Sequence, residues 1–281
     1  MTMQYNYLRL LFLFIAGCSI HLHSTAQSTL VLQPVQDNTL YESIDGSLSN
    51  GAGNHIFAGK TGIGTIRRAL LQFDFSSLPS NAVIQEVSLE MNVSKSAGAT
   101  TEVKLYTVRS AWGEGTSDAA GPEGMGTTAT NGDATWLHTS YPDQRWSKVG
   151  GDRLPIESAI TTISGVGKAK WNDKFMAMDI QGWLEEPEQN FGWMIVGEES
   201  IDQTANRFDS RESDNPPILQ ITYILGDDDD NGGDDDNGGD DDNGGDDDNG
   251  GDDDNGGDDD NGGDDDNGGD DDNGDDDDDD N

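Results

Sequence analysis

The sequence is poor in cysteine and in basic residues, and each shortage excludes a class of protein. Cys18 is the only cysteine, so the chain cannot form an internal disulfide or a site with several thiolate ligands. Only 15 lysines and arginines stand against 56 acidic residues, for a formal net charge of −41. Phosphate backbones repel a chain of this charge, which argues against a DNA or RNA partner. The sequence also has no apolar run long enough to cross a membrane as a helix.

The first 26 residues have the pattern of a signal peptide. The apolar run Leu10–Ala16 is too short to span a bilayer but typical of a signal-peptide core. Cleavage after Ala26 would give a secreted protein. The segment Ile15–Cys18 matches a lipobox equally well, and would leave Cys18 lipidated at the new N-terminus. We therefore expect a bacterial protein that is secreted or held at the cell surface, with an outer-membrane lipoprotein as one alternative.

The C-terminal segment 226–281 repeats the hexad Gly-Gly-Asp-Asp-Asp-Asn. It contains 31 aspartates and no apolar side chain, so it cannot bury a core and is expected to be disordered. Without these 31 residues the formal net charge changes from −41 to −10. The repeat lacks the bidentate Glu of an EF-hand loop and the apolar residue of a calcium-binding β-roll. We expect divalent cations to gather weakly along it, with a solvated spacer as the alternative.

Residues 27–225 predict one all-β domain. Apolar and polar residues alternate with period two in several segments, as along Val87–Val93. Turns rich in Gly and Pro separate these segments, and the helices that a parallel α/β fold needs are missing. We predict a single jelly-roll-like antiparallel β-sandwich with long loops. The other predicted strands are Thr29–Leu32, His55–Ala58, Leu71–Phe75, Val103–Thr107, Ile160–Ser164, Phe191–Gly197 and Pro217–Ile224.

One short helix is expected, around residues 178–186. Its predicted apolar stripe is Met178, Ile180, Trp183 and Leu184, and Pro187 ends the segment. We place Trp183 in the core for this reason, and Trp193 because it lies in an apolar strand pattern.

Four blocks of the domain match the pattern of one known family. The blocks are Asp37–Glu42, Arg67–Pro79, Ala111–Ser117 and Arg207–Glu212. They resemble the DNRLRE domain family, which is disaggregatase-related and similar to carbohydrate-binding modules associated with alginate lyases. Thr39 and Tyr41 stand where the naming motif has its two arginines. The resemblance implies a secreted β-sandwich module that binds a glycan, usually beside a polysaccharide-active enzyme or on a surface protein.

The polar, Gly-rich stretch 113–151 is the predicted glycan-binding surface, because loops on a rigid scaffold commonly carry function. An exposed tryptophan offers a sugar ring a flat apolar platform, and arginine donates two parallel hydrogen bonds to a carboxylate. The expected contact residues are Trp136, His138, Tyr141, Arg145 and Trp146 from this stretch, with Arg68 and Arg211 from the family-like blocks. A place in the core is the alternative for the two tryptophans, and a structural ion pair is the alternative for the arginines.

A structural calcium ion is a further hypothesis. Asp37, Asn38, Glu42 and Asn50 offer hard oxygen ligands near the first strands. Turn capping by the same residue types is the alternative explanation.

Three functions fit these observations. The first is a non-catalytic carbohydrate-binding module for a polysaccharide, which the loop aromatics and basic residues favour. The second is a cell-surface or matrix protein whose Asp-rich tail collects calcium. The third is a polysaccharide lyase or hydrolase, which would need a base beside a charge-neutralising group or two opposed carboxylates. His55 and His138 lie in no recognisable acid–base motif, so we expect the protein not to be an enzyme.

Overall fold

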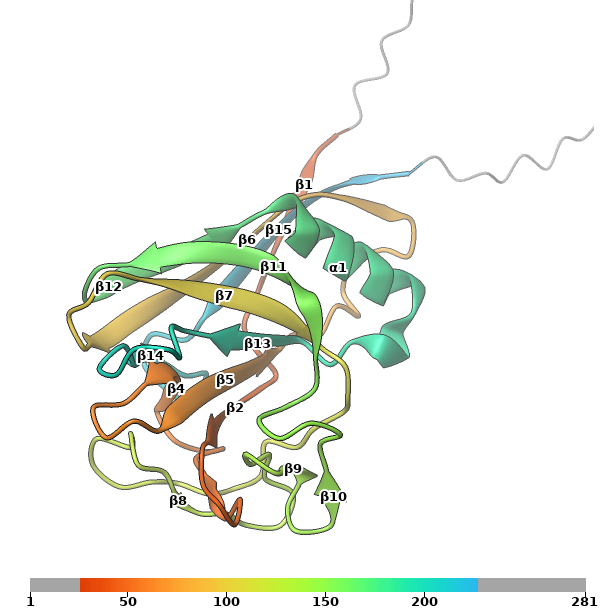
Figure 1. The fold of residues 1–281 in the computed structure, drawn as a ribbon. Coiled ribbons are helices and arrows are strands. Elements are labelled where there is room, and N and C mark those ends of the chain that lie inside the picture. The colour runs from red at the N-terminus through yellow and green to blue at the C-terminus, as the bar shows by residue number, and fades with distance from the viewer. Residues whose placement is uncertain (1–25, 227–281) are drawn as a thin grey trace, which may run out of the picture. The chain divides into compact units, whose positions relative to one another are not determined.

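The computed structural model describes residues 26–226, which form an antiparallel all-β domain (Figure 1). The strands are β1 Ser28–Leu32, β2 Gln36–Tyr41, β3 Leu48–Ser49, β4 His55–Lys60, β5 Ile66–Gln72, β6 Ala82–Ser96, β7 Thr101–Val108, β8 Thr127–Thr128, β9 His138–Ser140, β10 Gln144–Arg145, β11 Arg153–Ile163, β12 Gly167–Asn172, β13 Trp193–Val196, β14 Asn206–Asp209 and β15 Ile218–Leu225. The described helices are α1 Lys174–Glu185 and the 3-10 turn η1 Pro187–Gln189. The all-β fold predicted from the alternation is confirmed.

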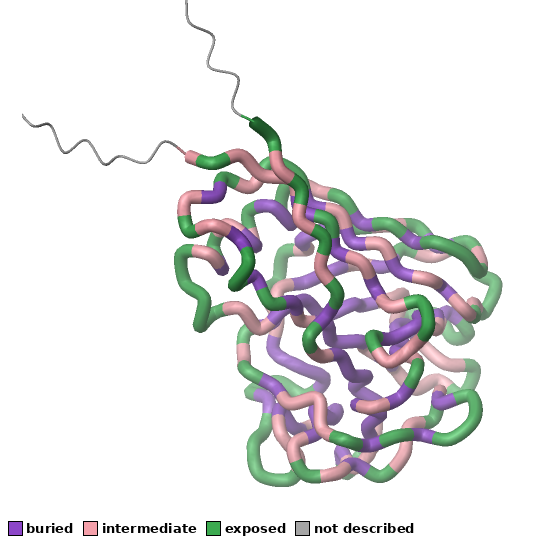
Figure 2. Tube along the Cα trace, turned by 180° about the vertical axis from the view of Figure 1, so that it is seen from behind, coloured by how far each residue is buried: buried purple, intermediate pink, exposed green. Residues whose placement is uncertain are grey.

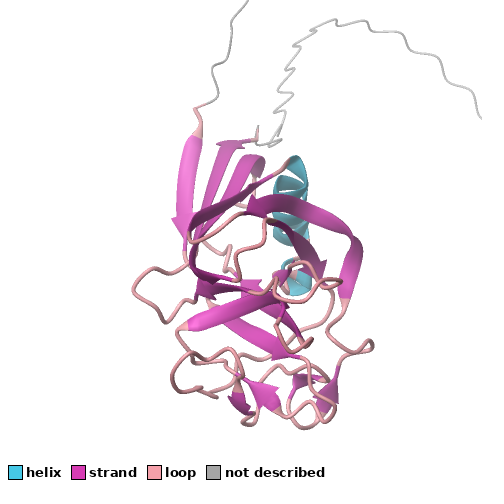
Figure 3. Ribbon diagram, turned by 60° about the vertical axis from the view of Figure 1, so that its left-hand side comes forward, coloured by secondary structure: helices cyan, strands magenta, loops and turns pink. Residues whose placement is uncertain are grey.

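Eleven strands join into one curled antiparallel sheet that forms a half-barrel. Its order is β1-β15-β6-β14-β4-β5-β13-β7-β11, with β12 paired to β6 and β2 paired to β5. The curl places the part around β6 opposite the part formed by β5, β13 and β7, as in a sandwich (Figure 3). The helix α1 packs against β6 and β11.

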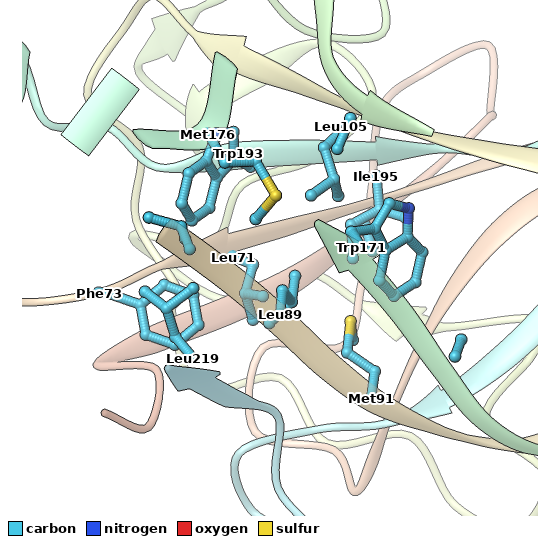
Figure 4. Close-up of a cluster of buried hydrophobic side chains, with 14 of the residues drawn as sticks. Leu71, Phe73, Leu89, Met91, Leu105, Trp171, Met176, Trp193, Ile195 and Leu219 are labelled. Carbon is cyan, nitrogen blue, oxygen red and sulfur yellow. The ribbon is translucent and has the colours of Figure 1, made fainter. Parts of the chain in front are cut away.

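The main core lies inside this curl. Val87, Leu89, Met91 and Val93 of β6 point into it at every second position, as the sequence pattern predicts. They meet side chains from the strands paired with β6, from the facing part of the sheet and from α1; those labelled in Figure 4 are Leu71, Phe73, Leu105, Trp171, Met176, Trp193, Ile195 and Leu219. Trp171 and Trp193 are fully buried. Each burial removes about 150–250 Å² of surface from water and is a large part of the driving force for folding.

The strands β5, β13 and β7 are buried on their second face as well. Leu70, Met194 and Tyr106 point away from the main core into a separate cluster, which we call the outer cluster. Its members are Leu40, Leu70, Tyr106, Val108, Trp112, Ala134, Trp136, Trp146, Met194 and Val196. Residues 109–152, here called the loop layer, cover this face of the sheet. Buried residues are therefore found both in the central strands β5, β13 and β7 and in the loop layer that covers them (Figures 1 and 2).

The helix differs from its prediction at one end and on one face. It begins at Lys174, because the side chain of Asp173 accepts a hydrogen bond from the backbone N–H of Phe175 and caps the first turn. Its buried residues are Met176, Ala177, Ile180 and Trp183. Met178, which we predicted in the apolar stripe, is 62% exposed. Ile180 and Trp183 face the core as predicted, and the buried stripe extends one turn further toward the N-terminus, through Met176 and Ala177.

Several sequence predictions lie outside the described residues. These are the signal peptide 1–26 apart from its last residue, the possible lipidation of Cys18, and the acidic tail 226–281 apart from Gly226. Within residues 26–226, no helix is both long and apolar enough to cross a bilayer.

Candidate functional site

All six tryptophans are buried, and this changes the predicted glycan-binding surface. Trp136 and Trp146 are only 7% and 6% exposed and belong to the outer cluster. The indole N–H of Trp146 donates to the backbone oxygen of Thr135 at 2.9 Å. The expectation that these two residues present open platforms to a sugar is wrong, because they fill the space between the loop layer and the sheet.

The other predicted contacts of this stretch lie on the hairpin of β9 and β10. His138 is buried, and its Nδ1 lies 2.9 Å from the hydroxyl of Thr135. Burial lowers the pKa of His138, and the charge of Arg145 lowers it further. The ring of Tyr141 packs edge-on against that of His138, with 5.2 Å between the centroids. Arg145 is exposed, so it is the residue of this group that projects most freely into solvent.

The two arginines of the family-like blocks that we predicted to contact a glycan, Arg68 and Arg211, form structural ion pairs. Arg68 donates from Nε and Nη2 to the two carboxylate oxygens of Glu199, at 2.7 and 2.9 Å. Its guanidinium carbon also lies 5.0 Å from the centroid of the Trp136 ring. Arg211 binds both carboxylate oxygens of Glu114, at 2.6 and 2.9 Å. Both forks are therefore occupied by carboxylates of the protein, which leaves neither arginine free for a ligand.

The structure does not bring the four predicted calcium ligands together. The side-chain oxygen of Asn38 accepts hydrogen bonds from Ser49 and from the backbone N–H of Thr39. Glu42 accepts from the backbone N–H of Ile66, and Asn50 accepts from that of Ala119. These three residues stabilise the ends of strands and loops.

Asp37 is the exception among the four predicted ligands. Its carboxylate lies beside those of Glu114 and Glu212, which are far from it in the sequence.

A polar pocket of about 310 Å³ lies where β7 ends and β11 begins. Three cationic side chains line it: Arg109, Lys148 and Arg153. Arg109 and Lys148 are exposed, and no ion pair with a carboxylate is found for any of the three in residues 26–226. The chain has only 15 lysines and arginines, so this gathering gives the pocket a charge opposite to that of the molecule.

Asp152 also lines the pocket, and its carboxylate accepts four hydrogen bonds. It accepts from the backbone N–H groups of Ser147 and Lys148, both at 2.8 Å, and from the hydroxyls of Ser147 and Ser110 at 2.7 and 3.2 Å. Burial acts to raise the pKa of Asp152, but these hydrogen bonds outweigh it and lower the pKa. Asp152 thus fixes the loop that carries Lys148 and holds it beside Arg109.

Arg153 is positioned by an aromatic ring. Its guanidinium carbon lies 3.7 Å from the centroid of the Tyr106 ring, a cation–π contact, and its Nη1 donates to the backbone oxygen of Leu154 at 3.4 Å. The site can therefore offer planar arginine donors and a lysine ammonium to one anionic group, such as a carboxylate.

No protein-family model matches this sequence, and a comparison with curated proteins found no match. The resemblance to the DNRLRE family stays a prediction from the motifs.

Sequence reasoning missed Arg109, Lys148, Asp152 and Arg153, although the loop that we predicted to bind contains Lys148. The available signal was that basic residues stand at both ends of this loop, at positions 109 and 153.

Proposed function

We propose that this protein is an exported, non-catalytic module that binds an acidic polysaccharide through the pocket of Arg109, Lys148 and Arg153. The observation that carries the proposal is the convergence of three cationic side chains in a domain that has 14 basic and 25 acidic residues, for a formal charge of −11. The motif resemblance to glycan-binding modules, stated from the sequence, points to the same class of ligand.

An acidic glycan suits this pocket better than a neutral one. Neutral sugars are commonly held by stacking on exposed aromatic rings, and all six tryptophans here are buried. The pocket instead offers charged donors and the hydroxyls of Ser110 and Ser147. Charge-assisted hydrogen bonds from arginine to a carboxylate are stronger than bonds between neutral groups, and their fixed geometry favours uronate residues.

The sheet supplies the rigidity that such a site needs. Arg109 directly follows β7, and Arg153 begins β11, which pairs with β7 opposite Val108. Lys148 stands on the loop that Asp152 and the outer cluster hold in place. Cations on paired strands keep their separation, so the ligand need not order them when it binds.

Affinity electrophoresis tests the proposal. The protein is run through gels that contain alginate, pectate or a neutral glucan, all with chelator so that calcium cannot crosslink the acidic glycans. We expect retardation by an acidic glycan and none by the neutral one. Arg109→Gln and Lys148→Gln change exposed side chains, and each should weaken binding by about tenfold to a hundredfold, since one charge-assisted hydrogen bond contributes about 1.5–3 kcal/mol.

Matched variants locate the binding face. Lys170→Gln removes the same charge on β12, outside the pocket, and should leave retardation unchanged. Arg145→Gln tests the hairpin face that the sequence favours. Loss of binding in Arg145→Gln alone would move the site to β10, and no retardation by any glycan would overturn the proposal. Release of shortened sugar products would show that the protein is an enzyme instead.

A further inference from the structure

Three carboxylates from distant parts of the chain meet at one end of β2. Asp37 lies in β2, Glu114 in the loop layer, and Glu212 in the segment after β14. One carboxylate oxygen from each residue lies within 4.8 Å of the other two. Like charges at this distance repel one another, so the fold brings them together against an electrostatic cost.

The one cation in this cluster does not satisfy all the oxygens. Arg211 binds both oxygens of Glu114 and lies 2.8 Å from Oε1 of Glu212. Its backbone N–H donates to Oδ2 of Asp37 at 2.7 Å. Oδ1 of Asp37 and Oε2 of Glu212 are buried and accept no hydrogen bond within residues 26–226. Asp37 itself is fully buried.

A buried carboxylate oxygen without a partner is costly, so a native structure normally supplies a partner to it. The cluster has three negative charges and one guanidinium, which leaves a formal charge of −2.

We propose that Asp37, Glu114 and Glu212 bind one calcium ion, with Oδ1 of Asp37 and Oε2 of Glu212 as its ligands and a carboxylate oxygen of Glu114 beside them. The ligands are all hard oxygens, the type that Ca²⁺ selects. Two oxygens at a Ca²⁺ distance of about 2.3–2.6 Å can be up to about 5 Å apart, which accommodates the observed spacing. A divalent charge also balances the cluster.

The ion can reach the cluster from solvent and would join three segments. The side chains of Glu114 and Glu212 are 18% and 22% exposed, so the cluster opens on their side while Asp37 forms its floor. Calcium would then link β2 to the loop layer and to the segment after β14. This role is separate from glycan binding, because none of these carboxylates lines the cationic pocket.

Thermal unfolding of the full protein without glycan tests the proposal. Calcium sites in extracellular modules have dissociation constants of about 10⁻⁴–10⁻³ M. At 10 mM CaCl₂ the midpoint should therefore rise by about 3 °C or more relative to chelator, with a smaller rise in 10 mM MgCl₂. Asp37→Asn and Glu212→Gln should each lose more than half of the calcium-dependent rise.

Every variant carries the Asp-rich tail. A difference between variants in the calcium-dependent rise of the midpoint therefore reports on the carboxylate cluster and not on the tail. Glu188→Gln, an exposed change on η1, is the matched control and should keep the full rise. An unchanged rise in both cluster variants would place the calcium effect elsewhere and overturn the proposal. The same holds if the wild-type midpoint does not move, or if magnesium raises it equally.

Discussion

The guanidinium of Arg153 lies over the ring of Tyr106, with 3.7 Å between the guanidinium carbon and the ring centroid. Tyr106 belongs to the outer cluster, so the cationic pocket is built directly on the buried second face of the sheet. Packing of that face and the position of a proposed ligand-binding group are therefore coupled.

Replacement of Tyr106 tests this coupling. Tyr106→Phe keeps an aromatic face beneath Arg153 and should bind acidic glycan as the wild type does. Tyr106→Leu removes the cation–π contact and should weaken glycan binding and lower the free energy of unfolding by about 1–3 kcal/mol. Urea unfolding and affinity electrophoresis of the two variants give the comparison. Equal binding by both variants would show that the ring does not position Arg153.

Asp152→Asn should loosen the loop that carries Lys148. An amide cannot accept the four hydrogen bonds that the carboxylate receives from Ser147, Lys148 and Ser110, so stability should fall by about 1–3 kcal/mol at pH 7. Because the folded protein lowers the pKa of Asp152, its contribution is present above the unfolded pKa of about 3.9 and is lost as the pH falls through the folded value. The difference in urea midpoint between wild type and variant should therefore narrow below about pH 4. A constant difference down to pH 2 would contradict this account.

Asp179 should show the opposite dependence on pH. Burial raises its pKa, although the indole N–H of Trp193 donates to it at 2.8 Å. A raised pKa means that the folded state holds the proton more tightly, so the contribution of Asp179 falls as the pH rises from about 3.9 through the folded pKa. Asp179→Asn keeps an acceptor for Trp193 without the charge, and should be more stable than the wild type at pH 7 but not at pH 3. Chemical denaturation at the two pH values measures this, and a variant that is less stable at pH 7 would refute it.

Trp136→Ala should behave as a core mutation. Its ring packs in the outer cluster and under Arg68, so truncation should cost about 3–5 kcal/mol. Glycan binding by the fraction that remains folded should fall less than in Arg109→Gln, because the ring helps to hold the loop of Lys148 but does not line the cationic pocket. Intrinsic fluorescence during urea titration gives the stability, and electrophoresis at low temperature gives the binding. Loss of binding in a fully folded variant would restore the platform interpretation.

Local pattern located eight of the eleven strands of the main sheet, but it missed β2, β12 and β14 and did not show what covers the sheet. The alternation along Val87–Val93 identified β6 correctly because one of its faces is buried there and the other is partly exposed. In β13, Trp193–Val196 is apolar at four successive positions and buried at each, which is the pattern of a strand covered on both sides. Such a run indicates that another segment of the chain covers the second face of the strand. The loop layer, which contains three tryptophans, is that segment.

The candidate sites depend on contacts that no local pattern encodes. Asp37, Glu114 and Glu212 are brought together by strand order, and their separations in sequence carry no spacing rule. Arg109 and Arg153 meet because β7 and β11 are antiparallel neighbours. Such contacts follow from the order of the strands in the sheet. The sequence pattern predicted only the class of fold and not this order.

The pairing of β1 with β15 has a consequence for engineering. Ser28 lies opposite Tyr223 in an antiparallel ladder, so the first and last strands run side by side at one edge of the sheet. A short glycine bridge could therefore join the two ends, and new termini could be opened at the exposed turn between β6 and β7. Because the two ends of the domain are adjacent, it can also be inserted into a surface loop of a host protein. The two loop residues that flank the insertion would then stay close together.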